Sequence, residues 1–410
     1  MQGGGDVLFC TLVTLLLIHN VLTESVQLTQ CPQSCELLSD EITLSCEEKG
    51  CTQVPSSDVR DAYYAEQIHY RKNLVTNVTI MDKFYNLKYI DFSYNQISYV
   101  MDYAFQNLNY LTRLNLAYNK LTNLRQQYFY KLNSLLELDL SGNELEFVGD
   151  NVFFDTMRAL HTLRLSKNRI RSITHNAFTD LPDLQYLHLD RNEITTLEQA
   201  DFLGLTSLQD LELSSNLFTA VPELAFRECE NLRNLHLSNN VIKLIEKGAF
   251  RNLGKLQVLN LEKNRLERLI PGMFDGLDNI DILYLDANPI SSIDSEALPL
   301  SLRKISLQLQ PNLEAIKNGT FSGMDQLTTL EITSSKKLIA IESGAFDGVN
   351  STVKTLSLHN NSLTTLSEAM VNWSLVKHLV LSQNNWNCDC NLAWIKHSSD
   401  LAEEDKKQVV

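Results

Sequence analysis

The cysteines are the residues whose type and spacing could do chemistry in this sequence. Apart from Cys10 in the apolar run near the N-terminus, four lie in one N-terminal stretch, two lie near the C-terminus, and one stands alone between them: Cys31, Cys35, Cys46, Cys51, Cys388, Cys390 and Cys229. Clustered thiols can form disulfides or hold a metal ion. The N-terminal four have no nearby histidine and no paired C-x-x-C spacing, which favours disulfides over a metal site; four cysteines allow three pairings.

The histidines do not form a catalytic pattern. The nine histidines fall singly along the chain, and His69, His188 and His236 occupy the same place in the repeats described below. The sequence contains no G-x-S-x-G, H-E-x-x-H or phosphate-loop motif. Catalysis would need a nucleophile, a base and stabilising donors in one pocket. We therefore expect no enzyme activity, no cofactor and no metal ion.

An apolar run near the N-terminus indicates the compartment. Residues 7–22, VLFCTLVTLLLIHNVL, precede small and polar residues, which is typical of a secretory signal peptide over residues 1–25. An uncleaved anchor is the alternative, but the run is shorter than the roughly 20 apolar residues of a spanning helix. No later segment could span a membrane. We expect a secreted protein with oxidised cysteines.

The charge of the chain bears on its partners. The formal net charge is −15 at pH 7, and the sequence pI is about 5.1. A polyanion would be repelled at long range by such a surface. Nucleic acid and acidic polysaccharide are therefore not expected as partners.

One unit repeats through most of the chain. The stretches LTRLNLAYNKL from Leu111, LLELDLSGNEL from Leu135 and LQYLHLDRNEI from Leu184 share the pattern L-x-x-L-x-L-x-x-N-x-L, mostly in steps of 24 residues. A second motif, A-F-x-x-L, recurs between these stretches. The asparagine column comprises Asn73, Asn95, Asn119, Asn143, Asn168, Asn192, Asn216, Asn240, Asn264, Asn288, Asn361 and Asn384.

This pattern resembles the leucine-rich repeat of extracellular proteins. The resemblance implies an α/β repeat fold: a right-handed, horseshoe-shaped solenoid with a concave parallel β-sheet and an irregular or short-helical convex side. It divides the chain into a signal peptide (1–25), a cysteine-rich cap (26–60), about fourteen repeats (61–386) and a partial C-terminal cap with a polar tail (387–410).

Elementary physics accounts for the residue types in each repeat. The L-x-L core predicts a short strand whose side chains alternate between buried and outward positions. Leucine fills the space between turns, because one unit cannot bury its apolar face alone. Asparagine offers two donors and an acceptor to main-chain groups that the bend leaves unpaired. The phenylalanine column, including Phe105, Phe178, Phe250 and Phe274, is expected to fill the wider convex side.

Two repeats break the pattern. Gln310 and Ser335 stand where asparagine belongs, and each of these units gains one residue before its next leucine. We expect altered curvature or a loosened ladder there. A functional loop is one explanation, and simple drift in a tolerant solenoid is the other.

The terminal cysteines resemble the caps that close such solenoids. For the N-terminal cap we favour pairing Cys31 with Cys51 and Cys35 with Cys46. The stretch WNCDCNLAWI, with Trp394, resembles the opening of the C-terminal cap without its last two cysteines, so Cys388 and Cys390 are expected to be unpaired or joined to another chain. Cys229 occupies a leucine place, which predicts a buried free thiol.

We expect function to reside in the outward strand positions, because their side chains are not needed for core packing. Tyrosine and arginine are the residue types that carry protein interfaces. The candidate ligand-binding residues on the concave face are Tyr89, Tyr94, Tyr118, Arg164, Tyr186, His188, Glu212, His236, Ile282 and Tyr284.

Five N-x-S/T sequons are candidate glycosylation sites: Asn77, Asn318, Asn350, Asn360 and Asn372. Four of the five follow residue 310, so glycans would leave the central concave face open. The glycan at Asn360 is the doubtful one, because this residue adjoins Asn361 of the ladder.

These features predict a secreted protein, of the extracellular matrix or the cell surface, that binds an extracellular protein ligand through its concave face. The alternative is a truncated ectodomain of a single-pass receptor in signalling or innate immunity. The unpaired cap cysteines leave open a disulfide-linked or non-covalent dimer.

Overall fold

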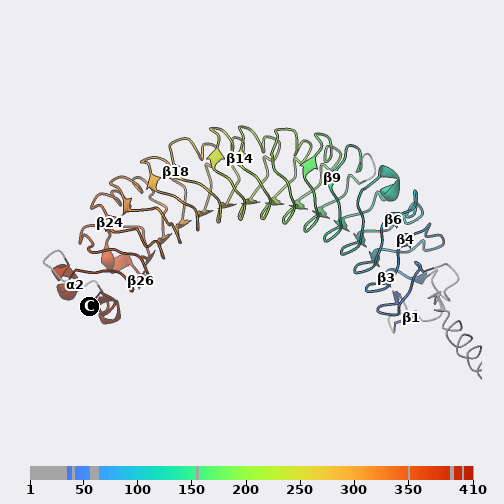
Figure 1. The fold of residues 1–410 in the computed structure, drawn as a ribbon, viewed down its shortest axis with the longest axis horizontal. Helices are drawn as coiled ribbons and strands as arrows, with labels where there is room; N and C mark the ends of the chain where they lie inside the picture. Colours follow the sequence, from blue (N-terminus) through green and yellow to red (C-terminus); the bar gives the residue numbers. More distant parts are fainter. Residues whose placement is uncertain are drawn as a thin grey trace, which may run out of the picture.

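The computed structural model describes residues 35–38, 42–55, 64–153, 157–349, 351–387, 392–398 and 401–409. In this part of the chain, successive coils stack into an arc, as Figure 1 shows. The predicted signal peptide, Cys31, Cys388, Cys390 and the sequon Asn350 lie outside the described residues.

One long sheet lines the inner edge of the arc (Figure 1). All of its neighbouring strands are parallel except β1 and β2, which form an antiparallel pair at the N-terminal end. In spatial order the sixteen strands are β1 (Glu36–Leu37), β2 (Thr43–Ser45), β3 (Gln67–His69), β5 (Tyr89–Asp91), β7 (Arg113–Asn115), β8 (Glu137–Asp139), β10 (Thr162–Arg164), β12 (Tyr186–His188), β13 (Asp210–Glu212), β15 (Asn234–His236), β17 (Val258–Asn260), β19 (Ile282–Tyr284), β21 (Lys304–Ser306), β23 (Thr329–Glu331), β25 (Thr355–Ser357) and β26 (His378–Val380).

The strands form where the repeat places a leucine between two outward residues. In β12 and β13, Leu187 and Leu211 are fully buried and lie in register, while the residues on either side remain partly exposed. Because the side chains alternate, one face of the sheet packs on the core and the other faces solvent. The predicted concave parallel sheet is confirmed.

Short strands also pair beyond the bend that follows each long strand. Within the described residues they form five parallel pairs: β4 (Asn77–Val78) with β6 (Tyr99–Val100), β9 (Phe147–Val148) with β11 (Ser172–Ile173), β14 (Ala220–Val221) with β16 (Leu244–Ile245), β18 (Arg268–Leu269) with β20 (Ser292–Ile293), and β22 (Ala315–Ile316) with β24 (Ala340–Ile341).

In the described part of the chain, helices are few and short. They are η3 (Gln126–Phe129), η4 (Trp373–Leu375), α2 (Ala393–His397) and α3 (Glu403–Lys406). Most of the remaining chain between strands runs in turns.

Phenylalanine rings stack from coil to coil in the core. Phe226, Phe250 and Phe274 succeed one another with ring centroids 6.5 and 6.2 Å apart and nearly parallel planes. All three are buried. The predicted phenylalanine column therefore packs between the coils, as expected.

The ladder asparagines tie adjacent coils together. The side-chain amide of Asn216 donates to the carbonyl oxygens of Leu189 and Leu213, both at 3.0 Å. Its Oδ1 accepts the backbone N–H of Ile194 at 3.1 Å. One buried side chain thus satisfies three main-chain groups on two coils, the role that the sequence predicts for this column.

The residue before each ladder position adopts a left-handed backbone. In this column φ lies between 53° and 67°, although thirteen of the fourteen residues are not glycine: Lys72, Tyr94, Tyr118, Gly142, Lys167, Arg191, Ser215, Asn239, Lys263, Ala287, Leu309, Ser334, Asn360 and Gln383. Residues other than glycine rarely adopt this conformation. The regular bend and its ladder hydrogen bonds hold them there.

The two irregular repeats change the ladder but not the sheet. Ile305, Leu330 and Leu356 keep the parallel register of β21, β23 and β25. Ser335 Oγ accepts the N–H of Gln310 itself at 3.0 Å. In regular coils the ladder side chain instead accepts the N–H of the residue two positions after the ladder asparagine of the preceding coil. For example, Asn216 accepts the N–H of Ile194, which follows Asn192 by two residues.

Gln310 leaves the ladder incomplete. Its Oε1 is buried without a hydrogen-bond partner in the described part of the chain. The expected loosening is therefore found in the polar ladder, while strand pairing continues.

Cysteine and tryptophan residues pack at the two ends. A disulfide joins Cys35 to Cys46 next to β1 and β2, and Cys51 is also disulfide-bonded. At the other end, the Trp394 ring of α2 lies 5.1 Å from that of Trp373, and its Nε1 donates to the carbonyl of Leu366.

The thiol of Cys229 is free and fully buried, as predicted. Burial raises its pKa to about 12.

The proposed domain limits remain predictions.

Candidate functional site: the concave face

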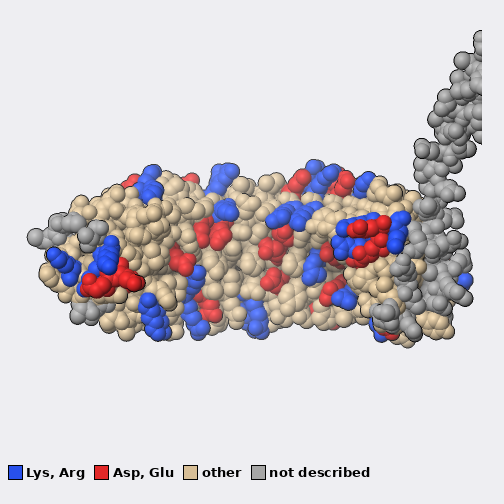
Figure 2. All heavy atoms as spheres, turned by 90° about the horizontal axis from the view of Figure 1, so that it is seen from below, with Lys and Arg blue, Asp and Glu red and all other residues tan. Residues whose placement is uncertain are grey.

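Two outward residues of each strand form columns along the concave face. Register pairs Arg164 with His188, His188 with Glu212, and Glu212 with His236. Figure 2 views this side of the molecule and shows positive and negative side chains interspersed rather than segregated by sign. The surface is therefore suited to a polar ligand of mixed character.

A row of aromatic and cationic side chains lies at the bend that follows the first strands. The rings of Tyr94 and Tyr118 stack with centroids 4.4 Å apart and planes 10° apart. Arg71 lies 5.8 Å from the Tyr94 centroid, and the Lys167 ammonium lies 5.5 Å from that of Tyr118. We call these four residues the tyrosine strip.

Gly142 makes room for the strip. A Cβ atom at this position would lie 2.6 Å from the Tyr118 ring, which no real contact allows. Because the side chain is absent, Lys167 reaches across this coil and its Nζ donates to the Tyr118 hydroxyl at 2.9 Å.

A second aromatic cluster lies on β3, β5 and β7. The Tyr89 ring meets His69 edge-on at 5.4 Å, and the Arg113 guanidinium lies 4.7 Å from its centroid. Burial, followed by the nearby Asp91 carboxylate, raises the pKa of Tyr89 to about 12. Tyr89 therefore remains a neutral hydrogen-bond donor at physiological pH.

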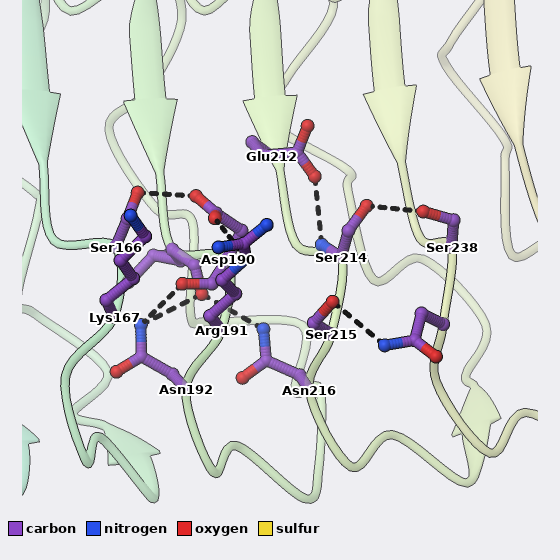
Figure 3. A network of polar contacts seen from close by, with 12 residues as sticks. Ser166, Lys167, Asp190, Arg191, Asn192, Glu212, Ser214, Ser215, Asn216 and Ser238 are labelled. Carbon is purple, nitrogen blue, oxygen red and sulfur yellow. Dashed lines mark hydrogen bonds and ion pairs between the residues drawn. The ribbon is translucent and has the colours of Figure 1, made fainter.

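The middle of the face holds a polar hollow of about 630 Å³, lined by acidic, basic and hydroxyl side chains that include His188, Arg191, Glu212, Ser238 and Glu262. Figure 3 shows part of its polar network. Ser214 and Ser238 share a hydroxyl hydrogen bond of 2.8 Å, and Glu212 accepts the Ser214 N–H at 3.0 Å. Ser166 donates to Asp190 on the neighbouring coil.

Glu262, which lines this hollow, lies next to a second carboxylate, Asp286. Burial, together with the neighbouring Asp286, raises the pKa of Glu262.

Within the described residues, no group of three or more histidine, cysteine or acidic side chains could hold a metal ion.

The predicted residues Ile282 and Tyr284 lie further along, on β19. Ile282 pairs in register with Val258. Lys304 lies 5.6 Å from the Tyr284 centroid and forms an ion pair with Glu331 at 3.1 Å. This part of the face combines an apolar patch with a charged pair.

The structure distributes the ten candidate residues along one surface. It brings Tyr94 and Tyr118 into contact and aligns His188, Glu212 and His236 on neighbouring strands. The remaining candidates lie in or beside the same columns, in separate groups. Whether they bind a ligand remains a prediction.

Sequence reasoning missed the cations of both aromatic groups and the glycine beside the tyrosine strip: Arg71, Lys167 and Gly142 at the strip, and Arg113 at the second cluster. The signal was present, since aligning the repeats puts Tyr118, Gly142 and Lys167 in one column. Only the structure shows the lysine reaching across the glycine.

The described sequons differ in exposure. Asn77, Asn318 and Asn372 are exposed. Asn360 is half-buried, and its Nδ2 donates to Ser334 Oγ at 3.0 Å. The structure gives this asparagine a competing partner on the neighbouring coil.

Among the described residues, no helix has both the length and the apolar character needed to cross a membrane.

Comparisons with known proteins agree with this architecture. The leucine rich repeat family model matches residues 75–121, 109–156, 158–218, 230–290 and 325–385. A curated relative, leucine-rich repeat-containing protein 3 of Danio rerio, is 38% identical over 123 residues, which is 29% of this chain and 45% of that protein. The chain therefore spans less than half the length of this relative.

Solved structures show the same fold. The TLR13–ssRNA13 complex matches with a TM-score of 0.79 and 25% identity, over 88% of this chain and 53% of that chain. The glycosylated Drosophila Toll–Spatzle complex matches with a TM-score of 0.66 and 21% identity, over 91% of this chain and 58% of that chain. A Leptospira interrogans LRR protein matches with a TM-score of 0.63 and 21% identity, over 84% of this chain and 90% of that chain.

The last two structures support the fold alone at this level of identity. The family model covers more than half of the chain, and its matches coincide with the coils of one parallel solenoid. The chain belongs to the leucine-rich repeat family.

Proposed function

We propose that this chain is a secreted or cell-surface recognition protein that binds an extracellular protein ligand with its concave face and catalyses no reaction. The observation that carries the proposal is the composition of that face. Its outward side chains are polar and aromatic and do not pack in the core, as in β12 and β13. Interfaces are enriched in tyrosine and arginine, both of which are present here.

The open shape of the face supports binding over catalysis. The central hollow is lined by side chains from several coils and is a surface depression rather than an enclosed pocket. A protein ligand could span many strands of such a surface, whereas a small substrate would stay exposed to water. The TLR13 chain, solved in complex with ssRNA13, has the same fold, which supports ligand recognition rather than catalysis.

A receptor ectodomain is the second candidate. The chain covers 53% of the TLR13 chain, which would suit the recognition part of a longer receptor. An adhesion or matrix protein would use the same face. The net charge of −15 supports a protein ligand over a nucleic acid.

The experiment is expression of the complete chain with its N-terminal segment, followed by measurement of binding to an array of purified extracellular proteins. Two concave variants, Glu212→Arg and Tyr284→Ala, should each weaken binding of a positive partner by about tenfold or more. Glu230→Arg, at an exposed position away from the sheet strands, is the matched control and should leave affinity unchanged.

Retention of the chain inside cells would count against secretion. Equal effects of the concave and control variants would refute recognition through this face.

A further inference from the structure

In the tyrosine strip, Tyr94 and Lys167 are exposed and Arg71 and Tyr118 are half-buried, although all four are held by contacts with one another. Tyr94 is 45% exposed. Both tyrosines have left-handed backbone conformations, with φ of 55°. An aromatic pair held rigidly at the surface loses little conformational entropy when a partner binds, which favours a role in binding.

The strip presents ring edges rather than ring faces. One face of each ring is used in the tyrosine stack. Arg71 and Lys167 lie over the rings of Tyr94 and Tyr118 from coils on opposite sides of the pair. An aromatic ring is negative on its face and positive at its edge. The accessible parts of the strip are therefore its positive edges and its phenol hydroxyls.

The cations of the strip form no ion pair within the described residues. Arg71 contributes to lowering the pKa of Glu48, after the larger effect of Lys72, and its own buried Nε has no hydrogen-bond partner in this part of the chain. Lys120, two residues after Tyr118, is exposed and donates to the neutral Gln96. Three positive side chains thus lie at this bend without an ion pair among the described residues.

Two nearby acidic side chains are paired with cations outside the strip: Glu48 with Lys72 at 2.6 Å, and Glu144 with Arg169 at 3.2 Å. Asp91 keeps its charge and accepts the N–H of Ser93 at 2.9 Å. The strip therefore gathers cations that form no ion pair among the described residues, on a chain whose net charge is −15.

We propose that the tyrosine strip is the docking site for an acidic segment of the protein ligand, whose aspartate and glutamate side chains meet the ring edges, the phenol hydroxyls and the unpaired cations. This inference rests on the proposed function, because it assumes a protein ligand on the concave side. It adds the chemistry of the partner and the coils that it contacts.

The geometry favours an acidic peptide over a single-stranded nucleic acid. Bases bind by stacking on open aromatic faces along a positive groove. Here the tyrosine faces are taken by each other and by Arg71 and Lys167. Carboxylates need no open face, and they can reach edges, hydroxyls and ammonium groups directly.

The test uses the complete chain and three labelled probes of matched length. The probes are a peptide of alternating Glu and Gly, its Gln and Gly analogue, and oligouridylate. Affinity is measured by fluorescence anisotropy at physiological ionic strength. The variants Tyr118→Leu and Lys167→Gln alter the strip; Lys167→Gln changes only a surface side chain and should not affect folding.

The matched controls are Tyr110→Leu and Lys243→Gln. Both residues are exposed and lie outside the strip. The acidic peptide should bind, and each strip variant should weaken it by about tenfold, whereas each control should change affinity by less than about twofold. The glutamine analogue and oligouridylate should bind more weakly than the acidic peptide.

Several results would overturn the assignment. These are no binding of the acidic peptide, equal binding of the glutamine analogue, strip variants that match the controls, or tighter, strip-dependent binding of oligouridylate. A protein partner from the array that is lost with Glu212→Arg but kept with Lys167→Gln would refute this docking site while leaving the proposed function intact.

Discussion

At the scale of single residues, Asp201 stands out because it is a carboxyl group in an apolar column. It precedes Phe202, in the place where other repeats carry the alanine of their A-F motif, and it is only 4% exposed. One carboxylate oxygen accepts the Glu198 N–H at 2.7 Å. Burial nevertheless raises the pKa of Asp201 to about 6.

The raised pKa makes the contribution of Asp201 to stability depend on pH. The folded state binds the proton more tightly than the unfolded state, whose ordinary value is 3.8. The stabilisation is therefore fully present below pH 3.8 and is lost as the pH rises through about 6. Asp201→Asn should raise stability at pH 7.5 by on the order of 1–2 kcal/mol and should flatten the profile between pH 5 and 7.5.

Thermal unfolding of both proteins across this pH range measures the difference. Asp183→Asn, at an exposed position, is the control and should keep the wild-type profile. Parallel profiles for wild type and Asp201→Asn would contradict the argument.

Gly142 gives a second prediction at this scale. Its φ is +67°, and an added Cβ would overlap the Tyr118 ring. Gly142→Ala should cost roughly 1–2 kcal/mol and displace Tyr118 from Lys167. Gly254→Ala is the matched control, because that glycine has no positive φ and its nearest neighbouring atom is 3.9 Å away. Denaturant unfolding compares the two, and equal stability of both variants would contradict the account.

At the scale of the coil, the main features of the fold could be predicted from the sequence. The L-x-L spacing fixes which side chains are buried, and asparagine at one position fixes the bend, as Asn216 illustrates. The left-handed column could not be predicted, because residues such as Tyr94 and Lys167 rarely adopt that backbone alone.

The candidate site was predicted only in outline, for the same reason. Tyr94 and Tyr118 could be assigned to the concave edge from their place in the repeat. Their stacking and the reach of Lys167 depend on the spacing between coils and on the absent side chain of Gly142. These contacts join residues from different repeats, which local sequence patterns do not specify.

Ladder positions should differ in their effect on stability. Asn216→Ala removes the acceptor of the buried Ile194 N–H and one of the two amide donors to each of the Leu189 and Leu213 carbonyls, which keep the donors of Asn192 and Asn240. It should cost about 2–3 kcal/mol. Ser335→Ala removes a hydroxyl that accepts the Gln310 N–H and donates weakly to the Thr333 carbonyl, and should cost roughly 1 kcal/mol. Chemical denaturation of the purified variants ranks them, and a larger loss for Ser335→Ala would be the opposite of what the hydrogen bonds imply.

At the scale of the whole molecule, stability should be the sum of coil stabilities and couplings between neighbours. Most neighbouring coils are joined by a complete set of asparagine ladder hydrogen bonds. In the coil of Gln310 the ladder Oε1 has no partner among the described residues, and in the coil of Ser335 a single hydroxyl replaces the asparagine amide. The arc is continuous in shape (Figure 1), yet its ladder of buried hydrogen bonds is weak between β21 and β23. The Lys304–Glu331 ion pair and the Thr333–Gln308 hydrogen bond also join these coils, but they lie outside the ladder.

This weak coupling predicts where the molecule opens first. Coils on the C-terminal side, which carry β23, β25 and β26, should exchange amide hydrogens before those of β13 and β15. Hydrogen exchange with peptide-level mass spectrometry measures the order directly. In the Asn216→Ala variant, which weakens the ladder beside β13, a second opening boundary should appear at the centre of the arc. Uniform exchange along the wild-type arc, or a variant with no new boundary, would mean that the leucine core and not the polar ladder sets the coupling between coils.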